Sequence, residues 1–403
     1  MKYVIKMSSL RQTDTFLAFV ILMAAASMVV SCSSDGADDN GQGPIRELHL
    51  MTATNLYGDL DITTTRSFDV VSGDDKATYE LYNEPGASLR VYITTKDRLD
   101  FYGDFEYAKP EGSANYSWTK KVPLDEDDYY IYGFMPSSLM NNASIAPNGT
   151  GYDKGAILTI GNVPALMTED FSVVVGLKRA ATLDGTIGSG ADNTPARGDY
   201  RYPVKSTDSK NYIYILLDHL YSRLRFKMKV SSEYNQLRRI NLKKIELTPV
   251  TYSKFNVTAS LTADRFLTLD ATYSPISGEG DMHPLFTCND EIETGKGPGL
   301  PLGTDFINFM TTETPALFAS NRSQYIHDIY VAPANYKISL KCTYDIYDTK
   351  GNLIRKDQTA TNEFSLGALN KGTSYNVSLT VSPTYLYVLS EPDLDNPTIK
   401  ITN

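Results

Sequence analysis

The amino-acid sequence predicts an all-β protein built from two tandem antiparallel β-sandwich domains. Apolar and polar residues alternate with period two along much of the chain, most clearly over 224–230, where even positions are apolar and odd ones basic. The 28 tyrosines favour pleated, half-buried surfaces. Segments rich in Gly, Asn and Asp, such as 72–75 and 348–352, have turn chemistry and separate these runs. Many short strands joined by turns are typical of sandwiches.

The start of the chain predicts export. Basic residues precede a short apolar stretch over 16–30, which is typical of a secretory signal and too short for a spanning helix. The sequence Val-Val-Ser-Cys at 29–32 resembles a bacterial lipobox, in which Cys32 is acylated and becomes the new N-terminus. We therefore expect residues 1–31 to be a lipoprotein signal peptide and a lipid to anchor the protein. An ordinary signal with an incidental cysteine is the alternative.

A flexible tether is expected directly after Cys32. Residues 33–40 are small, polar and acidic and have nothing to bury. Their acidity resembles the surface-export signal of Bacteroidota lipoproteins, although a tether alone explains it equally well.

Length and charge limit the classes of function. Removing 31 of 403 residues leaves 372, enough for two domains with cores. The same removal takes away three cationic residues and Asp14, so the net charge changes from −10 to −12. Such an acidic chain repels nucleic acid and anionic lipid, which argues against nucleic-acid partners.

The best internal boundary lies in the segment 184–208, which six Gly and Pro residues interrupt. We therefore predict an N-terminal domain over 67–205 and a C-terminal domain over 206–403. A long loop inside one domain is the alternative, although structureless loops of this length are uncommon.

Two cysteines lie far apart after the signal. Cys342 falls in the alternating run 338–346, on the apolar side, so we expect it to be buried in a strand and unpaired. A bridge to Cys288 stays open, but a chain of this size needs no disulfide framework.

The search for catalytic motifs predicts no enzyme, no cofactor and no metal site. The four histidines lack metal-ligand spacing, and no zincin, nucleophile-elbow or Walker motif occurs. His219 follows Asp218 before a strand and is expected to be a hydrogen-bonded structural residue. The acidic run 125–128 predicts a solvated turn rather than a Ca²⁺ loop. A hydrolase that uses two carboxylates alone stays open, since nothing marks a pair.

Four ordered groups of motifs resemble the fimbrillin family of Bacteroidota, the subunits of type V pili. They are the aromatic run at 129–136, the pair of segments 157–164 and 168–176, the strand at 218–226 and the late strand at 369–379. The resemblance covers most of the chain after the signal. It implies transthyretin-like, Greek-key sandwich domains and a location at the outer membrane, the cell surface and the fimbrium, where the protein would serve adhesion.

The resemblance also implies an assembly mechanism and partners. Family subunits are exported as lipoproteins, cut after an arginine by a surface protease, and lose their first strand. The loss of this strand opens a groove, which a strand from a neighbouring subunit then fills. The expected partners are therefore other pilus subunits, the outer membrane before processing, and an Arg-specific protease.

The sequence has candidates for the removable part within 32–66, the tether and first strand. The segment 47–54 alternates, with Leu48 and Leu50 facing inward. Arg66 follows in a polar stretch, and Arg66-Ser67 before Phe68 is similar to the family's processing site. Arg46 is the other candidate processing site. Alternatively, Arg66 is an ordinary surface residue that is not cleaved.

The C-terminal end, 384–403, offers donor strands. Tyr385, Tyr387 and Leu389 lie in a run that is apolar on both faces, and the segment 391–397 with two prolines should interrupt it. Ile399 and Ile401 form a second short strand. Both strands could instead close their own sandwich, as expected for a tip or anchor protein rather than a stalk protein.

The sequence therefore predicts a structural pilus subunit, stalk or tip, that assembles by strand exchange. The alternative is a monomeric surface lipoprotein that binds glycans, with exposed tyrosines and Trp118 stacking on sugar rings.

Overall fold

The computed structural model describes residues 44–55, 58–61, 79–81, 85–180, 183, 195–205, 211–264, 266, 268–292, 294–309, 324–326, 329–367, 369–385 and 392–402. The signal peptide, Cys32, Arg66 and Ser67 lie outside these residues. The described residues form four β-sheets, which confirms the all-β prediction.

The largest sheet contains mostly strands from the first half of the chain, and its ten strands are β12-β11-β14-β1-β6-β5-β4-β7-β13 in order, with β3 beside β1. Their bounds are β1 Ile45–Asn55, β3 Tyr79–Leu81, β4 Ser88–Thr94, β5 Leu99–Ala108, β6 Ser117–Pro123, β7 Asp128–Met135, β11 Ser172–Ala180, β12 Ala196–Arg197, β13 Arg201–Pro203 and β14 Asn211–His219. An additional pairing of β7 with β11 closes the sheet on itself. Within this closed sheet β1 lies between β14 and β6 and has no free edge.

Two further sheets contain most of the second half of the chain. The seven-stranded sheet consists of β2 Gly58–Asp61, β10 Leu166–Met167, β15 Ser222–Val230, β21 Ile307–Phe309, β23 Ile329–Val331, β26 Thr373–Tyr385 and β27 Pro392–Thr402. The six-stranded sheet consists of β16 Arg239–Pro249, β19 His283–Cys288, β20 Leu300–Leu302, β22 Gln324–Ile326, β24 Lys337–Tyr347 and β25 Leu353–Ser365. The inward residues of β15 and β24 share one apolar core, as expected for packed sheets.

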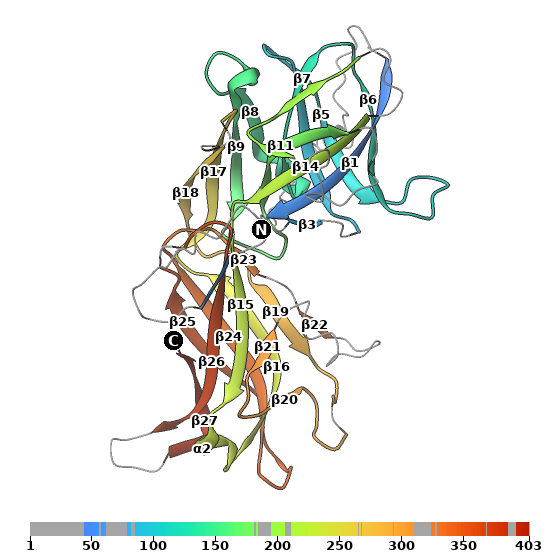
Figure 1. Ribbon diagram of the computed structural model, residues 1–403. Helices are drawn as coiled ribbons and strands as arrows, with labels where there is room; N and C mark the ends of the chain where they lie inside the picture. The colour runs from blue at the N-terminus through green and yellow to red at the C-terminus, as the bar shows by residue number, and fades with distance from the viewer. Residues whose placement is uncertain are drawn as a thin grey trace, which may run out of the picture. The chain divides into compact units, whose positions relative to one another are not determined.

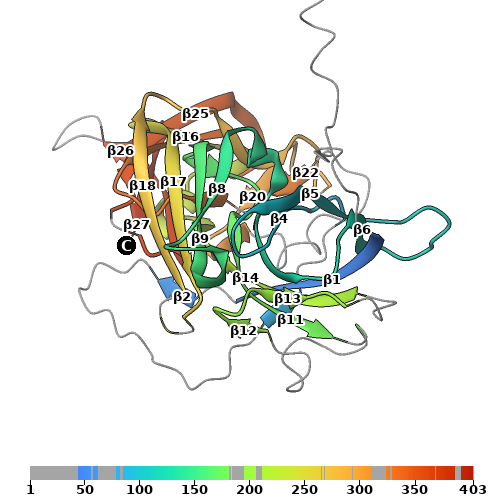
Figure 2. The same ribbon diagram turned by 90° about the horizontal axis from the view of Figure 1, so that it is seen from above.

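A four-stranded sheet joins strands from both halves of the sequence. It contains β8 Ala143–Pro147, β9 Gly155–Pro164, β17 Tyr252–Thr262 and β18 Leu269–Ser277, side by side in Figure 2. Short helical turns complete the described secondary structure: η1 Ser137–Asn142, η2 Tyr152–Lys154 and α2 Ser232–Asn235. Among the residues described above, no helix is long and apolar enough to cross a membrane.

Alternation explains why these segments became strands. Along β15 the even residues from Leu224 to Val230 are buried and the basic odd residues are half-exposed, so one face reaches the core. The run Tyr212–Leu217 is apolar on both faces, and its strand β14 lies inside the largest sheet between β11 and β1. The domain boundary at residue 205 stays a prediction, and the pairings of β14 with β11 and of β17 with β9 cross it.

The cysteine prediction is confirmed. Cys288 and Cys342 are both buried, and neither forms a disulfide bond. Burial raises the pKa of the Cys342 thiol well above its usual range, so this side chain is an inert part of the core.

Candidate functional site

The candidate site is the position of β1 between β14 and β6, which we call the β1 slot (Figure 1). Residues Leu48–Thr54 pair with Asn211–Leu217 in parallel, and Ile45–Leu50 pair with Trp118–Pro123 in antiparallel register. Near its end β1 also pairs with β3. The first described strand is therefore an interior strand, hydrogen-bonded along both edges.

The core-facing side of β1 is apolar. Leu48 and Leu50 are 1% and 5% exposed, and Thr52 is fully buried. The two leucines belong to the same core cluster as Trp118 and Ile213 from the flanking strands. Both leucines thus face inward, while their place in a removable strand stays a prediction.

The other side of β1 and its beginning are held by polar groups and rings. The His49 imidazole Nδ1 lies 3.2 Å from Thr119 Oγ1, and its ring centroid lies 5.0 Å from that of Tyr212. The buried Arg46 guanidinium donates from Nε to the Leu124 carbonyl at 3.0 Å. These contacts fix the register in which the leucines reach the core.

Strand β2 follows β1 in the chain but belongs to another sheet. Residues Gly58–Asp61 pair in parallel with Thr373–Asn376 at the start of β26. Further along β26, Ser378–Tyr385 pair with β27. The segment before Arg66 therefore contributes a strand to each of two sheets.

The last described strand, β27, lies at an edge of its sheet, because among the described strands it pairs with β26 alone. Ile399 is 1% exposed, its carbonyl accepts a hydrogen bond from Asn362 Nδ2, and Ile401 lies opposite Leu379. Tyr385 ends β26, whereas Tyr387 and Leu389 lie outside the described residues.

The structure differs from the predicted interruption over 391–397. Strand β27 already begins at Pro392, and the register between Ser382 and Thr384 jumps from Thr398 to Asp393. This irregularity contains Pro397. An edge strand tolerates proline because it needs no ladder hydrogen bond on its outer side.

His219 is hydrogen-bonded, as predicted, and its partner is Asp170 rather than the adjacent Asp218. His219 is buried, and its Nδ1 lies 2.7 Å from Asp170 Oδ2, to which the Ser172 hydroxyl also donates at 3.1 Å. The adjacent Asp218 instead forms an ion pair with Arg197 at 2.7 Å. Asp170 is 49 residues away in sequence, so no local pattern could have indicated it.

Trp118 corrects another expectation. We expected it to be available for stacking on sugars, but it is 1% exposed and lies in the core beside the leucines of β1. A large apolar ring next to the β1 slot is more stable inside the core than in water, so Trp118 cannot stack on a bound glycan.

The acidic run 125–128 is exposed, and Asp128 forms an ion pair with Arg201 at 2.8 Å. Within the described residues, no group of three or more His, Cys, Asp or Glu side chains is arranged to hold a metal ion.

Comparison with known proteins gives structural neighbours only. No family model matches the sequence, and no curated protein matches it. A candidate cell adhesion protein from Bacteroides fragilis is similar over 89% of this chain and 97% of its own, with 11% identity and a TM-score of 0.37. A fimbrial protein from Bacteroides vulgatus is similar over 78% of this chain and 91% of its own, with 15% identity and a TM-score of 0.37.

Candidate polysaccharide-binding proteins from Bacteroides thetaiotaomicron are similar over 85% of this chain and 93% of theirs, with 10% identity and a TM-score of 0.30. These neighbours are thus Bacteroides proteins described as cell adhesion, fimbrial or polysaccharide-binding proteins. At these identities and TM-scores the likeness carries no argument about function.

Proposed function

We propose that this chain is a structural subunit of a surface pilus that serves adhesion and assembles by strand exchange. In this proposal β1 is removed, and a strand from another subunit fills the β1 slot. The observation that supports it most is that the first described strand is an interior strand of a closed sheet.

Chain order makes such a strand removable. Strands β1 and β2, residues 45–61, both precede Arg66. One cut of the Arg66–Ser67 bond would therefore detach them together, with no chain to thread out of the sheet. An interior strand such as β14 has chain on both sides, so its removal would need two cuts.

An empty β1 slot is a binding site for an extended strand. It exposes unpaired backbone groups of β14 and β6, and each hydrogen bond regained contributes about 0.5–1.5 kcal/mol. It also exposes the surface that covers Leu48 and Leu50, and burying one leucine contributes about 1.5–3 kcal/mol. A strand that restores both terms binds by strand addition.

The C-terminal strand of another copy fits this slot in pattern. Ile399 and Ile401 flank Lys400 as Leu48 and Leu50 flank His49. We therefore place the two isoleucines at the leucine positions, with the run from Tyr385 through Tyr387 to Leu389 as the adjoining part of the donor arm. Since β27 is an edge strand, its withdrawal breaks one ladder rather than two.

The burial of Arg46 argues against it as the processing site. Arg46 is 8% exposed, lies opposite Val122 in the sheet and donates to the Leu124 carbonyl. A protease needs an accessible, unpaired segment, so the Arg46 bond is protected in the folded chain. The assignment of Arg66–Ser67 itself rests on the sequence.

The route to the surface is part of the proposal. Acylation of Cys32 would anchor the exported chain to the outer membrane, and cleavage after Arg66 by an Arg-specific surface protease would release it for assembly into a fimbrium. In this role the chain is a structural protein and not an enzyme. The alternative of a monomeric glycan-binding lipoprotein loses its main candidate side chain, because Trp118 is buried.

The test is an Arg66→Ala variant in cells that carry the Arg-specific protease. We expect a folded lipoprotein that stays monomeric, because β1 remains in its slot. Arg98→Ala is the matched control, since that side chain is exposed and lies outside the β1 slot. Normal polymer formation by Arg66→Ala would overturn the proposal.

A further inference from the structure

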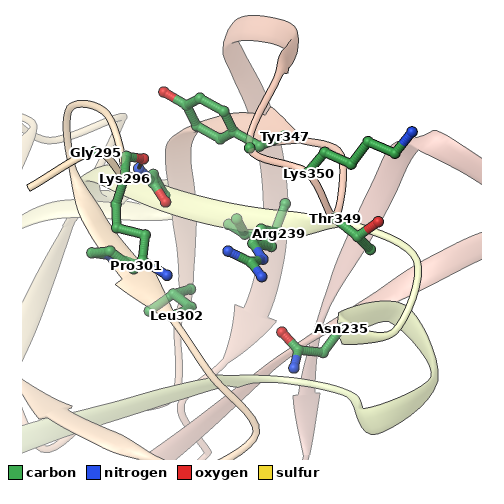
Figure 3. A pocket seen from close by; sticks show the side chains of 12 residues that line it. Asn235, Arg239, Gly295, Lys296, Pro301, Leu302, Tyr347, Thr349 and Lys350 are labelled. Atoms are coloured by element: carbon green, nitrogen blue, oxygen red, sulfur yellow. Dashed lines mark hydrogen bonds between the residues drawn. The ribbon is translucent and has the colours of Figure 1, made fainter. Parts of the chain in front are cut away.

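A pocket lies among the turns at one end of the six-stranded sheet (Figure 3). We call it the basic pocket. It has a volume of about 440 Å³, within the usual range of small-ligand sites, roughly 300–1,000 Å³. Its walls come from the end of α2, the start of β16, the segment before β20, β20 itself and the β24–β25 turn. The lining residues used below are Asn235, Arg239, Lys296, Tyr347, Thr349 and Lys350.

The charge of the basic pocket is opposite to that of the chain. The full chain carries a net charge of −10, yet the lining includes Arg239, Lys296 and Lys350 and no carboxylate. All three cations are exposed, and no ion pair joins any of them to a carboxylate of the described residues. Figure 3 shows Arg239 in the middle of the lining side chains and the Lys350 ammonium pointing away from it.

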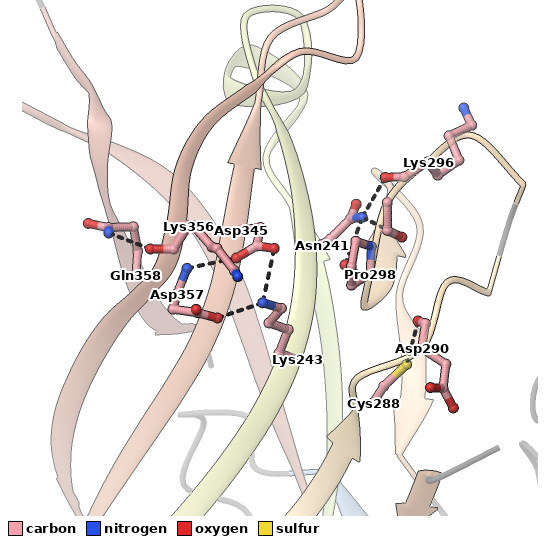
Figure 4. Close-up of polar contacts among 11 residues, drawn as sticks. Asn241, Lys243, Cys288, Asp290, Lys296, Pro298, Asp345, Lys356, Asp357 and Gln358 are labelled. Atoms are coloured by element: carbon pink, nitrogen blue, oxygen red, sulfur yellow. Dashed lines mark hydrogen bonds and ion pairs between the residues drawn. The ribbon is translucent and has the colours of Figure 1, made fainter.

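The wall that carries Lys296 is fixed by internal hydrogen bonds. Glu291 Oε1 accepts from the backbone N–H groups of Gly295 at 2.5 Å and Lys296 at 3.1 Å. From the opposite side, Asn241 Nδ2 donates to the carbonyls of Lys296 at 2.7 Å and Pro298 at 3.1 Å (Figure 4). This wall is therefore in place before any ligand arrives.

Glycine is required where this wall meets Tyr347. Gly297 has a φ of +81°, and a Cβ at this position would collide with the Tyr347 hydroxyl. The close approach places the tyrosine at the rim of the basic pocket. A left-handed backbone of this kind favours glycine over other residues.

The wall that carries Thr349 and Lys350 is a capped turn. Asp348 Oδ1 accepts from the backbone N–H groups of Lys350 and Asn352, both at 2.8 Å. The hydrogen bonds from Asn352 hold the pKa of Asp348 below its usual value. The carboxylate thus stays ionised and occupied with its own turn.

The buried carboxylate of Asp345, on the same strand as Tyr347, is also paired. Lys243 Nζ lies 3.1 Å from Asp345 Oδ2 and 2.5 Å from Asp357 Oδ1 (Figure 4). These acids form their ion pairs with Lys243 inside the β16–β24–β25 sheet and not with Arg239, Lys296 or Lys350.

We infer that the basic pocket binds an acidic saccharide, whose carboxylate or sulfate group lies between Arg239 and Lys296. A guanidinium matches the two oxygens of such a group with a pair of parallel hydrogen bonds. Asn235 and Thr349 supply neutral polar groups for sugar hydroxyls. The site is a concavity closed by three turns rather than a linear groove or sheet edge, which suits a sugar residue better than an extended acidic peptide.

The experiment measures binding of defined ligands to the full folded chain by calorimetry. The probes are a galacturonate trisaccharide, a sulfated chondroitin disaccharide and the neutral maltotriose. We expect one or both acidic probes to bind, more weakly as salt rises, and maltotriose not to bind. The chondroitin disaccharide carries a uronate carboxylate as well as its sulfate. Binding of both acidic probes therefore indicates that a carboxylate is sufficient, and binding of the chondroitin disaccharide alone indicates that the sulfate is required.

Variants locate the site. We expect Arg239→Gln and Lys296→Gln each to weaken binding about tenfold or more, the loss of one charge-assisted contact. Lys356→Gln, which removes an exposed charge of the same sheet outside the pocket, should bind as the parent does. Unchanged melting temperatures would show that the variants fold.

Three results would overturn the inference: equal binding of neutral and acidic sugars, unchanged affinity in both pocket variants, or binding of an acidic peptide but of neither acidic sugar. The inference does not depend on strand exchange, since none of the pocket residues lies in β1, β2 or β27. Polymer formation by Arg239→Gln is therefore expected to stay normal whichever result is found.

Discussion

The first and last described strands have similar sequences and opposite places in the fold. Both β1 and β27 alternate apolar with polar residues and bury an aliphatic side chain almost completely. Yet β1 lies inside a closed sheet with partners on both sides, whereas β27 lies at an edge beside β26. The position of a strand in the sheet, and not its side-chain pattern, therefore decides how many ladders of backbone hydrogen bonds break when the strand is removed.

The two strands also differ in regularity. Strand β1 keeps an unbroken parallel register with β14 from Leu48 to Thr54. Strand β27 has a register jump near Pro397. A regular interior slot is selective for a strand of the right pattern, and an irregular edge strand is easier to detach.

The largest effect is expected from a chain that begins at Ser67 and so lacks β1 and β2. Loss of two leucines and of the ladders on both sides should lower the free energy of unfolding by roughly 5 kcal/mol or more. Thermal unfolding and binding of a hydrophobic dye measure this loss. Adding a peptide of residues 45–55, which replaces β1 but not β2, should raise the melting temperature towards that of the full chain. The same peptide with Leu48→Asp and Leu50→Asp should not raise it. Equal effects of the two peptides would show that the slot does not recognise the strand.

A smaller loss of stability is expected from truncation after Val381, which removes β27 and the last residues of β26, Ser382–Tyr385. One ladder at an edge is lost, so the melting temperature should fall less than for the chain that begins at Ser67. Incorporation into fibres should nevertheless stop, because the donor strand is gone. If the truncated chain enters fibres as a donor, β27 is not the donor strand and a tip role is favoured.

Single substitutions compare the two strands directly. Leu50→Ala should lower the free energy of unfolding by about 2–5 kcal/mol. Ile399→Ala should lower it by about 2 kcal/mol, the low end of that range, because the structure around an edge strand relaxes more easily. Urea denaturation measures both. A larger loss for Ile399→Ala would reverse the proposed order of the two strands.

The smallest expected effect is a pH-dependent difference in melting temperature. The Lys243 ammonium lowers the pKa of Asp357, so the stabilisation is present above the carboxyl's unfolded pKa and is lost as the pH falls through its folded value. Asp357→Asn should therefore melt slightly below the parent at pH 7, and the two should converge in acid. Because Asp357 pairs within the β16–β24–β25 sheet, this change should leave release of β27 unaltered. A pH-independent difference would argue against the ion pair.

Several parts of the fold could be predicted from the sequence because they depend on local alternation. The strand over 224–230, the inward leucines of 47–54 and the buried Cys342 all follow from period two. The partners of these strands could not be predicted in this way. Nothing local indicates that β14 pairs in parallel with β1, or that the two strands lie on opposite sides of the predicted boundary.

The same difference between local pattern and distant contacts decides which site residues could be predicted. Leu48, Leu50, Ile399 and Ile401 were found as candidates because each lies in an alternating run. The partner of His219 and the cations of the basic pocket were missed, because distant turns bring Arg239, Lys296 and Lys350 together. Trp118 was misplaced because an aromatic residue in a strand has the same local pattern on either face.

The most direct test of strand exchange is limited cleavage of the folded chain, without its signal peptide, by an arginine-specific protease. N-terminal sequencing and unheated SDS gels follow the product. We predict a new N-terminus at Ser67 and a ladder of heat-labile oligomers as freed slots take up the C-terminal strands of other copies. Resistance at Arg66 in a chain that stays monomeric would contradict the account.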